Sequence, residues 1–409
     1  MRKIIATCLL SAVMLMTFAP VFAGAQGQSL PITTNLEASA GSGSSDPIVV
    51  KAKWEMYTPG YLYGGSMPAV LGEDESSDLG AQFVAPGVWG ENLEYQICAI
   101  VHGPSGNVDN IRDVYAEIFW PEDRRMHTSG HLYNDTTDKG RYNADGAEID
   151  NPAGGCGRMI EQNQLVRLTQ ADGIDLVCNN IQTYNNSLIE WYNPYDYAEV
   201  CNPFDGQLIK NRARVYCHDK VLTWEDPAGD YEVQVFAYDT NNNRSNILVN
   251  RFTYLEEIGY EVDFNSVAYG PLAIGEHKKI YGNKFFNESY TSATPTIRNL
   301  GNTRIQISIA QDDMGLGYLD SAPSTWRVQY NARIGDLEED WRTYDPTRQK
   351  GTSDSLAFTT LMELLDLSEI EEMDFSIKVS EKWPGNLQSY SGSMWLEAGI
   401  AQWDACPTT

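Results

Sequence analysis

The chain has 409 residues, of which 56 are Asp or Glu and 29 are Lys or Arg, so its formal net charge is −27 at pH 7. A surface this acidic repels nucleic acid and anionic lipid, and it excludes nucleic-acid binding from the expected functions. It suits solubility in salt, cation binding or a position in a charged cell envelope.

The first residues predict export from the cell. Arg2 and Lys3 precede an apolar run over residues 4–19, and a small-residue site follows at Ala23-Gly24-Ala25. This arrangement is typical of a signal peptide over residues 1–25. No later stretch has the length and apolar composition of a bilayer span. We therefore expect an extracellular or cell-surface protein with no membrane span after signal cleavage, and a flexible linker over residues 26–46, which are rich in small and polar residues.

Alternating hydrophobic residues predict a β-sandwich over residues 47–256. Two strands show the alternation most clearly, and in each the apolar residues share one face. The residues are Leu93, Tyr95, Ile97, Ala99 and Val101 in one strand and Val114, Ala116, Ile118 and Trp120 in the other.

A long polar segment at about 134–210 interrupts this pattern and is predicted to be an insertion that carries the specific function. A short helix is expected over residues 172–184, opened by Asp172. Aromatic residues then crowd together, and they are candidates for ligand binding because an aromatic face beside a polar edge suits stacking on a sugar ring. The candidates are Trp191, Tyr192, Tyr195 and Tyr197. The alternative is that they pack the insertion onto the sandwich.

Six cysteines follow the signal peptide, and an even number in an exported chain predicts up to three disulfides. They are Cys98, Cys156, Cys178, Cys201, Cys217 and Cys406. Their spacing lacks the C-x2-4-C pairs of zinc sites, and the connectivity stays open because sequence does not fix it.

The run from Asp226 to Asn246 combines a turn, an alternating strand and an Asn-rich tip. Tyr231 stands two residues before the core position Val233, which is the spacing of the tyrosine corner in immunoglobulin-like sandwiches. The run resembles the Ig-like, PKD-like and cadherin-like modules of secreted prokaryotic surface proteins. The resemblance implies a fold and a location, and by itself no specific function.

The tip of this run is also a candidate cation site. Asp239, Asn241 and Asn243 alternate in the manner of oxygen ligands for calcium, although an Asn-rich hairpin tip forms without a metal. No other cofactor is expected. Four Asn-x-Ser/Thr sequons, at Asn134, Asn185, Asn243 and Asn287, are glycosylation candidates.

A second antiparallel sandwich is predicted over residues 257–409, so the fold class is all-β with two Ig-like sandwiches in tandem. Turns at 299–302 and 383–386 predict two hairpins, and residues 361–367 fit either a strand or a short helix. The run from Thr294 to Ile309 and the run from Tyr390 to Ala398 are similar to filament subunits of the TasA and camelysin class.

The sequence lacks a Gly-x-Ser-x-Gly elbow and a phosphate-binding Gly-rich loop, so we expect no enzyme. The first hypothesis is a non-catalytic structural or adhesion protein of the cell surface, whose partners are other envelope proteins or further copies of itself. The alternative is a secreted carbohydrate-binding module that binds glycans through the aromatic residues of the insertion.

Overall fold

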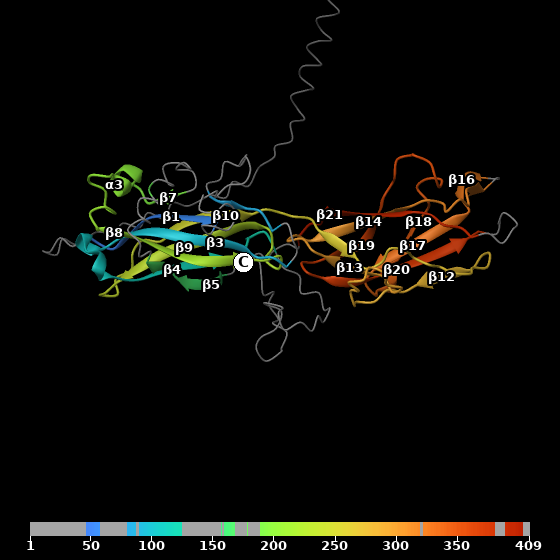
Figure 1. Cartoon of the computed structure of the whole chain (residues 1–409), viewed down its shortest axis with the longest axis horizontal. Coiled ribbons are helices and arrows are strands. Elements are labelled where there is room, and N and C mark those ends of the chain that lie inside the picture. Colours follow the sequence, from blue (N-terminus) through green and yellow to red (C-terminus); the bar gives the residue numbers. More distant parts are fainter. Residues whose placement is uncertain are drawn as a thin grey trace, which may run out of the picture. The chain divides into compact units, whose positions relative to one another are not determined.

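The structure, a computed structural model, describes residues 46–57, 80–86, 90–124, 157, 159–167, 178, 189–319, 322–380 and 389–403. Strands dominate these residues (Figure 1). The helical elements are short, and they are η1 (Pro104–Gly106), η2 (Val108–Asn110), α3 (Tyr197–Cys201) and η4 (Glu338–Asp340). None of the described helices is long and apolar enough to cross a bilayer. The all-β expectation is confirmed at the level of class.

Two five-stranded sheets lie within residues 46–254. The first has the order β6 (Val166–Arg167), β8 (Ala213–Leu222), β3 (Leu93–His102), β1 (Val49–Tyr57) and β7 (Glu190–Trp191). The second has the order β2 (Gln82–Phe83), β10 (Leu248–Tyr254), β9 (Gly229–Asp239), β4 (Ile111–Phe119) and β5 (Met159–Gln164). All pairs are antiparallel except the short contact of β2 with β10, which is parallel.

The main core lies between these two sheets. The apolar residues predicted to share one face of each of two strands all belong to it, and each is at most 8% exposed. They lie on β3 and β4, except Trp120, which directly follows β4. Rings of Phe83, Tyr95, Tyr231 and Phe252 pack within the core at centroid distances of 4.9–5.3 Å. Burial of this apolar area is the main stabilising contribution to the sandwich.

The predicted tyrosine corner is present at the start of β9. The hydroxyl of Tyr231 donates to the backbone carbonyl of Pro227 at 2.7 Å, and the side chains of Tyr231 and Val233 are fully buried. The hydrogen bond satisfies a polar hydroxyl that the core would otherwise leave unpaired.

The described part of the predicted insertion contributes to both sheets. β5 pairs with β4, β6 pairs with β8 and β7 pairs with β1. This part of the segment therefore extends the sandwich, in addition to carrying loops.

Further sheets lie within residues 257–403. One has the order β11 (Tyr260–Val262), β13 (Thr296–Asn299), β20 (Ile370–Val379), β17 (Val328–Ile334) and β18 (Arg342–Tyr344), with β12 (His277–Ile280) also paired to β20. Another has the order β19 (Thr359–Leu365), β14 (Ile305–Gln311) and β21 (Met394–Ile400), and β15 (Tyr318–Leu319) pairs with β16 (Ala322–Trp326). Apolar residues from β14, β17, β19 and β20 form one buried cluster. Residues 361–365, for which the sequence fitted either a strand or a short helix, are part of β19.

Both predicted hairpins are wrong. β13, before the turn at 299–302, pairs with β11 and β20, whereas β14, after it, pairs with β19 and β21. The turn at 383–386 lies outside the described residues, but β20 and β21 on either side of it belong to different sheets. Both connections therefore pass from one sheet to another, and Asn and Gly favour a tight turn in either case.

Several predictions concern residues that lie outside the described ones. These are the signal peptide, almost all of the linker, Cys156, Cys406, Asn134, Asn185 and all of the predicted helix except Cys178, which is helical. The predicted domain boundaries stay predictions.

Candidate functional site

The segment that follows β7, up to Ile209, lies over the face of the first sheet that points away from the main core. β7 places the segment, with Trp191 opposite Ala52 on β1 and Glu190 opposite Lys53. Asp196 then begins α3, because its side chain accepts a hydrogen bond from the backbone N–H of Glu199 at 2.9 Å. This is the capping interaction that favours Asp before a first helical turn.

A second apolar cluster, here called the α3 core, lies between this segment and the sheet. It combines Ala52, Trp54 and Met56 of β1 with residues of β3, β8 and α3, and further members are Cys98, Ile100, Cys178, Ile189, Val200, Cys201, Leu208, Ala213, Val215 and Cys217. The sheet therefore has a buried apolar layer on both faces, which explains why every residue of β1 is buried.

Two disulfides hold this layer. Cys98 on β3 and Cys217 on β8 are directly opposite each other, with Cα atoms 4.2 Å apart, so this bridge lies within one sheet. Cys178 is joined to Cys201 at the end of α3, with Cα atoms 5.6 Å apart. Two of the predicted bridges are thus assigned, and the second anchors α3 to the preceding chain.

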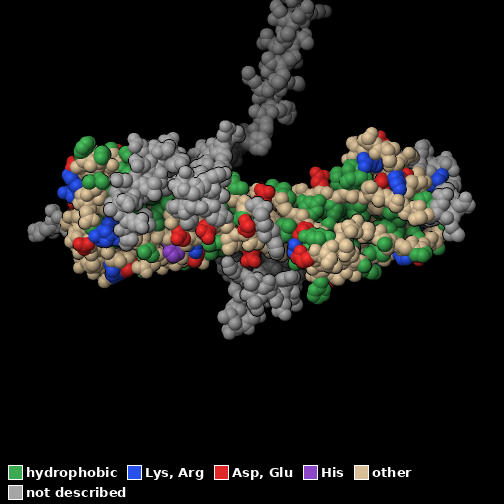
Figure 2. Space-filling model, viewed as in Figure 1, with side chains coloured by type: hydrophobic (Ala, Val, Ile, Leu, Met, Phe, Trp, Pro, Cys, Tyr) green, Lys and Arg blue, Asp and Glu red, His purple; other side chains and the backbone are tan. Residues whose placement is uncertain are grey.

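The four aromatic candidates divide into two pairs. Trp191 and Tyr197 are half-buried and pack against the α3 core, which is the structural alternative stated for them above. Tyr192 is 40% exposed, and its ring centroid lies 6.2 Å from that of Tyr195. Phe204, just after α3, is 89% exposed. Hydrophobic side chains are accordingly visible on the surface over α3 (Figure 2).

Charged groups lie directly beside the tyrosines. Lys51 Nζ is 3.7 Å from the centroid of the Tyr195 ring and 3.0 Å from Glu199 Oε1. Burial lowers the pKa of Lys51, while the hydrogen bond and charge of Glu199 act in the opposite direction. We call the set Lys51, Tyr192, Tyr195, Glu199 and Phe204 the α3 surface. Sequence reasoning missed Lys51 and Glu199, because Lys51 is 141 positions before Tyr192 and only β1–β7 pairing brings them together.

The hairpin tip proposed for calcium is a hydrogen-bonded turn. Asp239 Oδ1 accepts from the backbone N–H groups of Asn241 and Asn243, both at 2.8 Å, and Oδ2 accepts from Asn243 Nδ2 at 2.8 Å. Burial raises the pKa of Asp239, but these hydrogen bonds outweigh it and the pKa is lowered overall. Within the described residues, no group of three or more His, Cys, Asp and Glu side chains is arranged to hold a metal. Calcium at this tip stays a prediction.

Two of the four sequons lie in the described residues. Asn243 is exposed at the tip, where its amide nitrogen donates to Asp239. Asn287 is exposed as well, and its amide oxygen accepts from the backbone of Ser289. Glycosylation of both residues stays a prediction.

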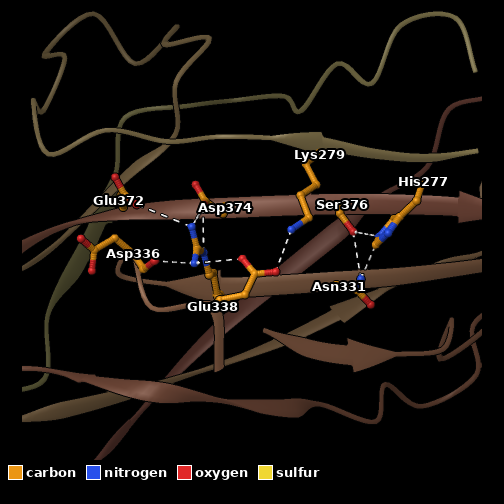
Figure 3. A network of polar contacts seen from close by, with 9 residues as sticks. His277, Lys279, Asn331, Asp336, Glu338, Glu372, Asp374 and Ser376 are labelled. Atoms are coloured by element: carbon orange, nitrogen blue, oxygen red, sulfur yellow. Dashed lines mark hydrogen bonds and ion pairs between the residues drawn. The ribbon is translucent and has the colours of Figure 1, made fainter. Parts of the chain in front are cut away.

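Residues on the outer face of β12, β17 and β20 include a serine and histidine in contact (Figure 3). His277 Nε2 lies 2.5 Å from Ser376 Oγ, and Asn331 Nδ2 is 3.0 Å from each of them. A nucleophilic serine must reach its substrate, yet Ser376 has no exposed surface. The geometry assigns these three residues to cross-strand hydrogen bonding.

The same face continues as a network of charges around Arg333. Its guanidinium pairs with Asp374 at 2.8 Å and donates to the carbonyl of Asp336 at 2.6 Å. Lys279 pairs with Glu338 at 3.1 Å. The Trp341 ring lies under both cations, with its centroid 5.0 Å from Arg333 and 4.7 Å from Lys279. These contacts hold the 335–341 loop against the sheet. A structural role is therefore enough to explain this network.

No family model matches the sequence, and no curated protein matches it. Among solved structures, the C-terminal domain of the AgI/II polypeptide BspA from Streptococcus agalactiae aligns over 82% of this chain and 92% of its own, at 11% identity and a TM-score of 0.17. An α-L-rhamnosidase from Dictyoglumus thermophilum aligns over 78% of this chain and 26% of its own, at 10% identity and a TM-score of 0.13. Superpositions with such low scores support no structural or functional argument.

Proposed function

We propose that this protein is a non-catalytic extracellular protein of the cell surface that acts in adhesion or assembly, and that the α3 surface is its contact with a partner. The observation that carries the proposal is the construction of this surface. A disulfide and a separate apolar core hold α3 against the sandwich, yet Tyr192 and Phe204 point outward. Exposed aromatic side chains on a rigid support are typical of binding surfaces.

The disulfides support the extracellular location. Bridges such as Cys98–Cys217 and Cys178–Cys201 form and persist in oxidising compartments and are rare in the cytosol. They agree with the signal peptide expected over residues 1–25. The acidic charge of the chain further favours cationic or neutral partners over nucleic acid.

A glycan is the second candidate for the partner, and one observation favours it. The exposed Tyr192 lies beside Tyr195, whose ring contacts Lys51. Glu199, the partner of Lys51, is 39% exposed. An aromatic face and an accessible carboxylate are therefore adjacent. A sugar ring presents the same combination of C–H faces and hydroxyl groups.

The test uses two substitutions on the α3 surface, Tyr192→Ala and Phe204→Ser, in the full exported chain. We expect both to reduce retention of the purified protein on cell-envelope preparations of the producing organism by at least about tenfold, which corresponds to 1.4 kcal/mol of binding free energy. Phe285→Ser is the matched control, because Phe285 is 82% exposed and far along the chain, in the segment after β12.

Melting temperatures of the three variants separate binding from folding. Unchanged retention with both α3-surface variants, at unchanged melting temperature, would refute this surface as the contact. Loss of retention for Phe285→Ser alone would move the contact to residues 281–290. Repeating the assay on a glycan array, and by light scattering for self-association, distinguishes a sugar from a protein partner.

A further inference from the structure

Three polar side chains meet in the interior of the first sandwich. Lys53 and Glu55 lie on β1 and have no exposed surface, and Asn250 lies on β10 and is 8% exposed. Lys53 and Glu55 alternate with Ala52, Trp54 and Met56, whose side chains belong to the α3 core on the other face. Lys53 and Glu55 therefore point toward the main core, as does Asn250 between Leu248 and Phe252.

The two strands belong to different sheets, so the meeting depends on how the sheets pack. β1 pairs with β3 and β7, whereas β10 pairs with β9 and β2. A second contact between them lies nearby, where the Asn246 side chain donates to the carbonyl of Val50 at 3.0 Å and accepts from its N–H at 2.9 Å. Figure 1 shows β1 and β10 side by side in the sandwich.

The contacts among the three groups are specific. Lys53 Nζ is 2.6 Å from Glu55 Oε1 and also contacts Asn250 Oδ1. Asn250 Nδ2 donates to Glu55 Oε2 at 2.8 Å. Each oxygen of the Glu55 carboxylate thus faces one nitrogen, either Lys53 Nζ or Asn250 Nδ2. Lys53 Nζ also contacts Asn250 Oδ1, which is bonded directly to the amide carbon Cγ.

The surroundings favour a reactive amine. Opposite Lys53 and Glu55 on β3 stand Ala99 and Ile97, and the Tyr95 and Phe252 rings pack 5.2 Å apart in the same core. Burial lowers the pKa of Lys53, although the charge and hydrogen bond of Glu55 counteract it. A desolvated lysine beside a carboxylate can give up its proton and act as a nucleophile.

We propose that Lys53 and Asn250 join in an intramolecular amide bond, with Glu55 as the proton-transfer group. The Lys53 ammonium gives a proton to Glu55 Oε1, and the free electron pair of Nζ forms a bond to Asn250 Cγ. Glu55 then delivers a proton to Nδ2, the Cγ–Nδ2 bond breaks with its electrons passing to nitrogen, and ammonia leaves. The excess proton on Nζ is released with the ammonia. One ammonium group and one primary amide become one secondary amide and one ammonium ion, so the step needs no oxidant or cofactor.

The buried pairs beyond residue 256 provide an internal comparison. Arg304 pairs with Asp366, and Arg333 pairs with Asp374, all four being at most 5% exposed. An arginine remains protonated and does not serve as a nucleophile in this way. Only the first sandwich, among the described buried ion pairs, combines a lysine, a carboxylate and a carboxamide.

The bond would connect β1 with β10, which are the first and last strands of residues 46–254. It would also connect the two sheets, since each strand belongs to one of them. A chain pulled from both ends would then transmit force through a covalent bond, bypassing the hydrogen bonds of the intervening strands. Such a link suits an extracellular protein under mechanical load, and it does not depend on what the α3 surface binds.

Intact-mass spectrometry of the reduced full exported chain tests the proposal. We expect a mass below that of its sequence by one ammonia molecule, and a digest containing a branched peptide that joins the segments around Lys53 and Asn250. Deamidation of an asparagine raises the mass and is therefore distinguished. In Glu55→Gln, which keeps the size of the side chain, we expect the full mass of the variant sequence and no branched peptide.

Lys51→Met is the matched control. Lys51 lies on the same strand, is 2% exposed and pairs with Glu199, but no carboxamide of the described residues contacts its Nζ. The link between Lys53 and Asn250 should therefore still form in this variant. A wild-type protein with its full sequence mass, and with Lys53 open to acetylation after unfolding, would overturn the proposal. This outcome is read on the wild type, so it does not depend on the folding of any variant.

Discussion

Lys53 and Asn250 contact each other between the two sheets of the first sandwich, although they are separated by 197 positions in the chain. Glu55 bridges them, with one carboxylate oxygen on each nitrogen. Removing two charges from water costs free energy even when they are paired, and replacing a buried ion pair by apolar residues of similar volume is often neutral or stabilising. The arrangement is better explained by chemistry than by stability of the ion pair alone.

The proposed link predicts a large effect on unfolding. A cross-link that closes a loop of this length stabilises a protein by about 5 kcal/mol, because it restricts the unfolded chain. The double substitution Lys53→Met with Glu55→Gln removes the link and both charges together, so no unpaired ion remains. We expect its free energy of unfolding, measured with guanidinium chloride, to fall by about this amount. A double variant as stable as the wild type would contradict the prediction, and Lys51→Met controls for loss of a buried lysine.

The tyrosine corner predicts a smaller effect. Tyr231→Phe removes the hydrogen bond from the hydroxyl to Pro227 and leaves the carbonyl without that donor. Loss of one partner from a buried hydrogen bond costs about 1–3 kcal/mol. Denaturant unfolding measures the change, and Tyr238→Phe on the same strand is the control, because Tyr238 is half-buried. Equal losses in the two variants would refute a special role for the corner.

Asn299 is expected to stabilise the connection between β13 and β14. Its side chain is 1% exposed, and its Nδ2 lies within 3.2 Å of the carbonyls of Thr303, Leu365 and Asp366. Its Oδ1 accepts from the backbone of Gly301 at 2.8 Å. Asn299→Ala should lower the free energy of unfolding by about 2–4 kcal/mol, because several buried backbone groups lose a partner. The exposed Asn287 provides the control, and a loss below about 0.5 kcal/mol for Asn299→Ala would contradict the assignment.

The hairpin tip predicts a pH-dependent contribution from Asp239. Its pKa is lowered in the folded protein, so the ionised form stabilises the fold above the unfolded pKa of about 3.9. This contribution is lost as the pH falls through the folded pKa. We expect Asp239→Asn to be less stable than the wild type at pH 7, and the difference to shrink below pH ~4. Equal stability at pH 7 would contradict the prediction.

The same variant tests the calcium prediction. If the tip binds calcium, adding the ion raises the melting temperature of the wild type, because ligand binding to the folded state stabilises it. Asp239→Asn would then lose this response. A melting temperature that calcium leaves unchanged in both proteins would refute calcium binding at this tip.

Local regularities in the sequence determined the class of the fold. Alternation predicted the inward faces of β3 and β4, since side chains of a strand point to opposite sides in turn. The spacing of Tyr231 and Val233 predicted the corner, because both partners of that hydrogen bond lie within five residues. The even number of cysteines indicated disulfides without indicating that Cys98 would join Cys217.

Only the tertiary structure decided which segments pair. The turn after β13 has the same residues whether the chain returns to its own sheet or crosses to another, so the predicted hairpin was wrong. Lys51 contacts Tyr195 only because β1 pairs with β7. The sequence contained one signal for the buried polar cluster, which was the presence of charged residues such as Lys53 and Glu55 within an otherwise apolar strand. No local feature connected them with Asn250. Sequence determines what each strand can bury, whereas the packing of two sheets decides which buried groups meet, because that packing depends on contacts distant in the chain.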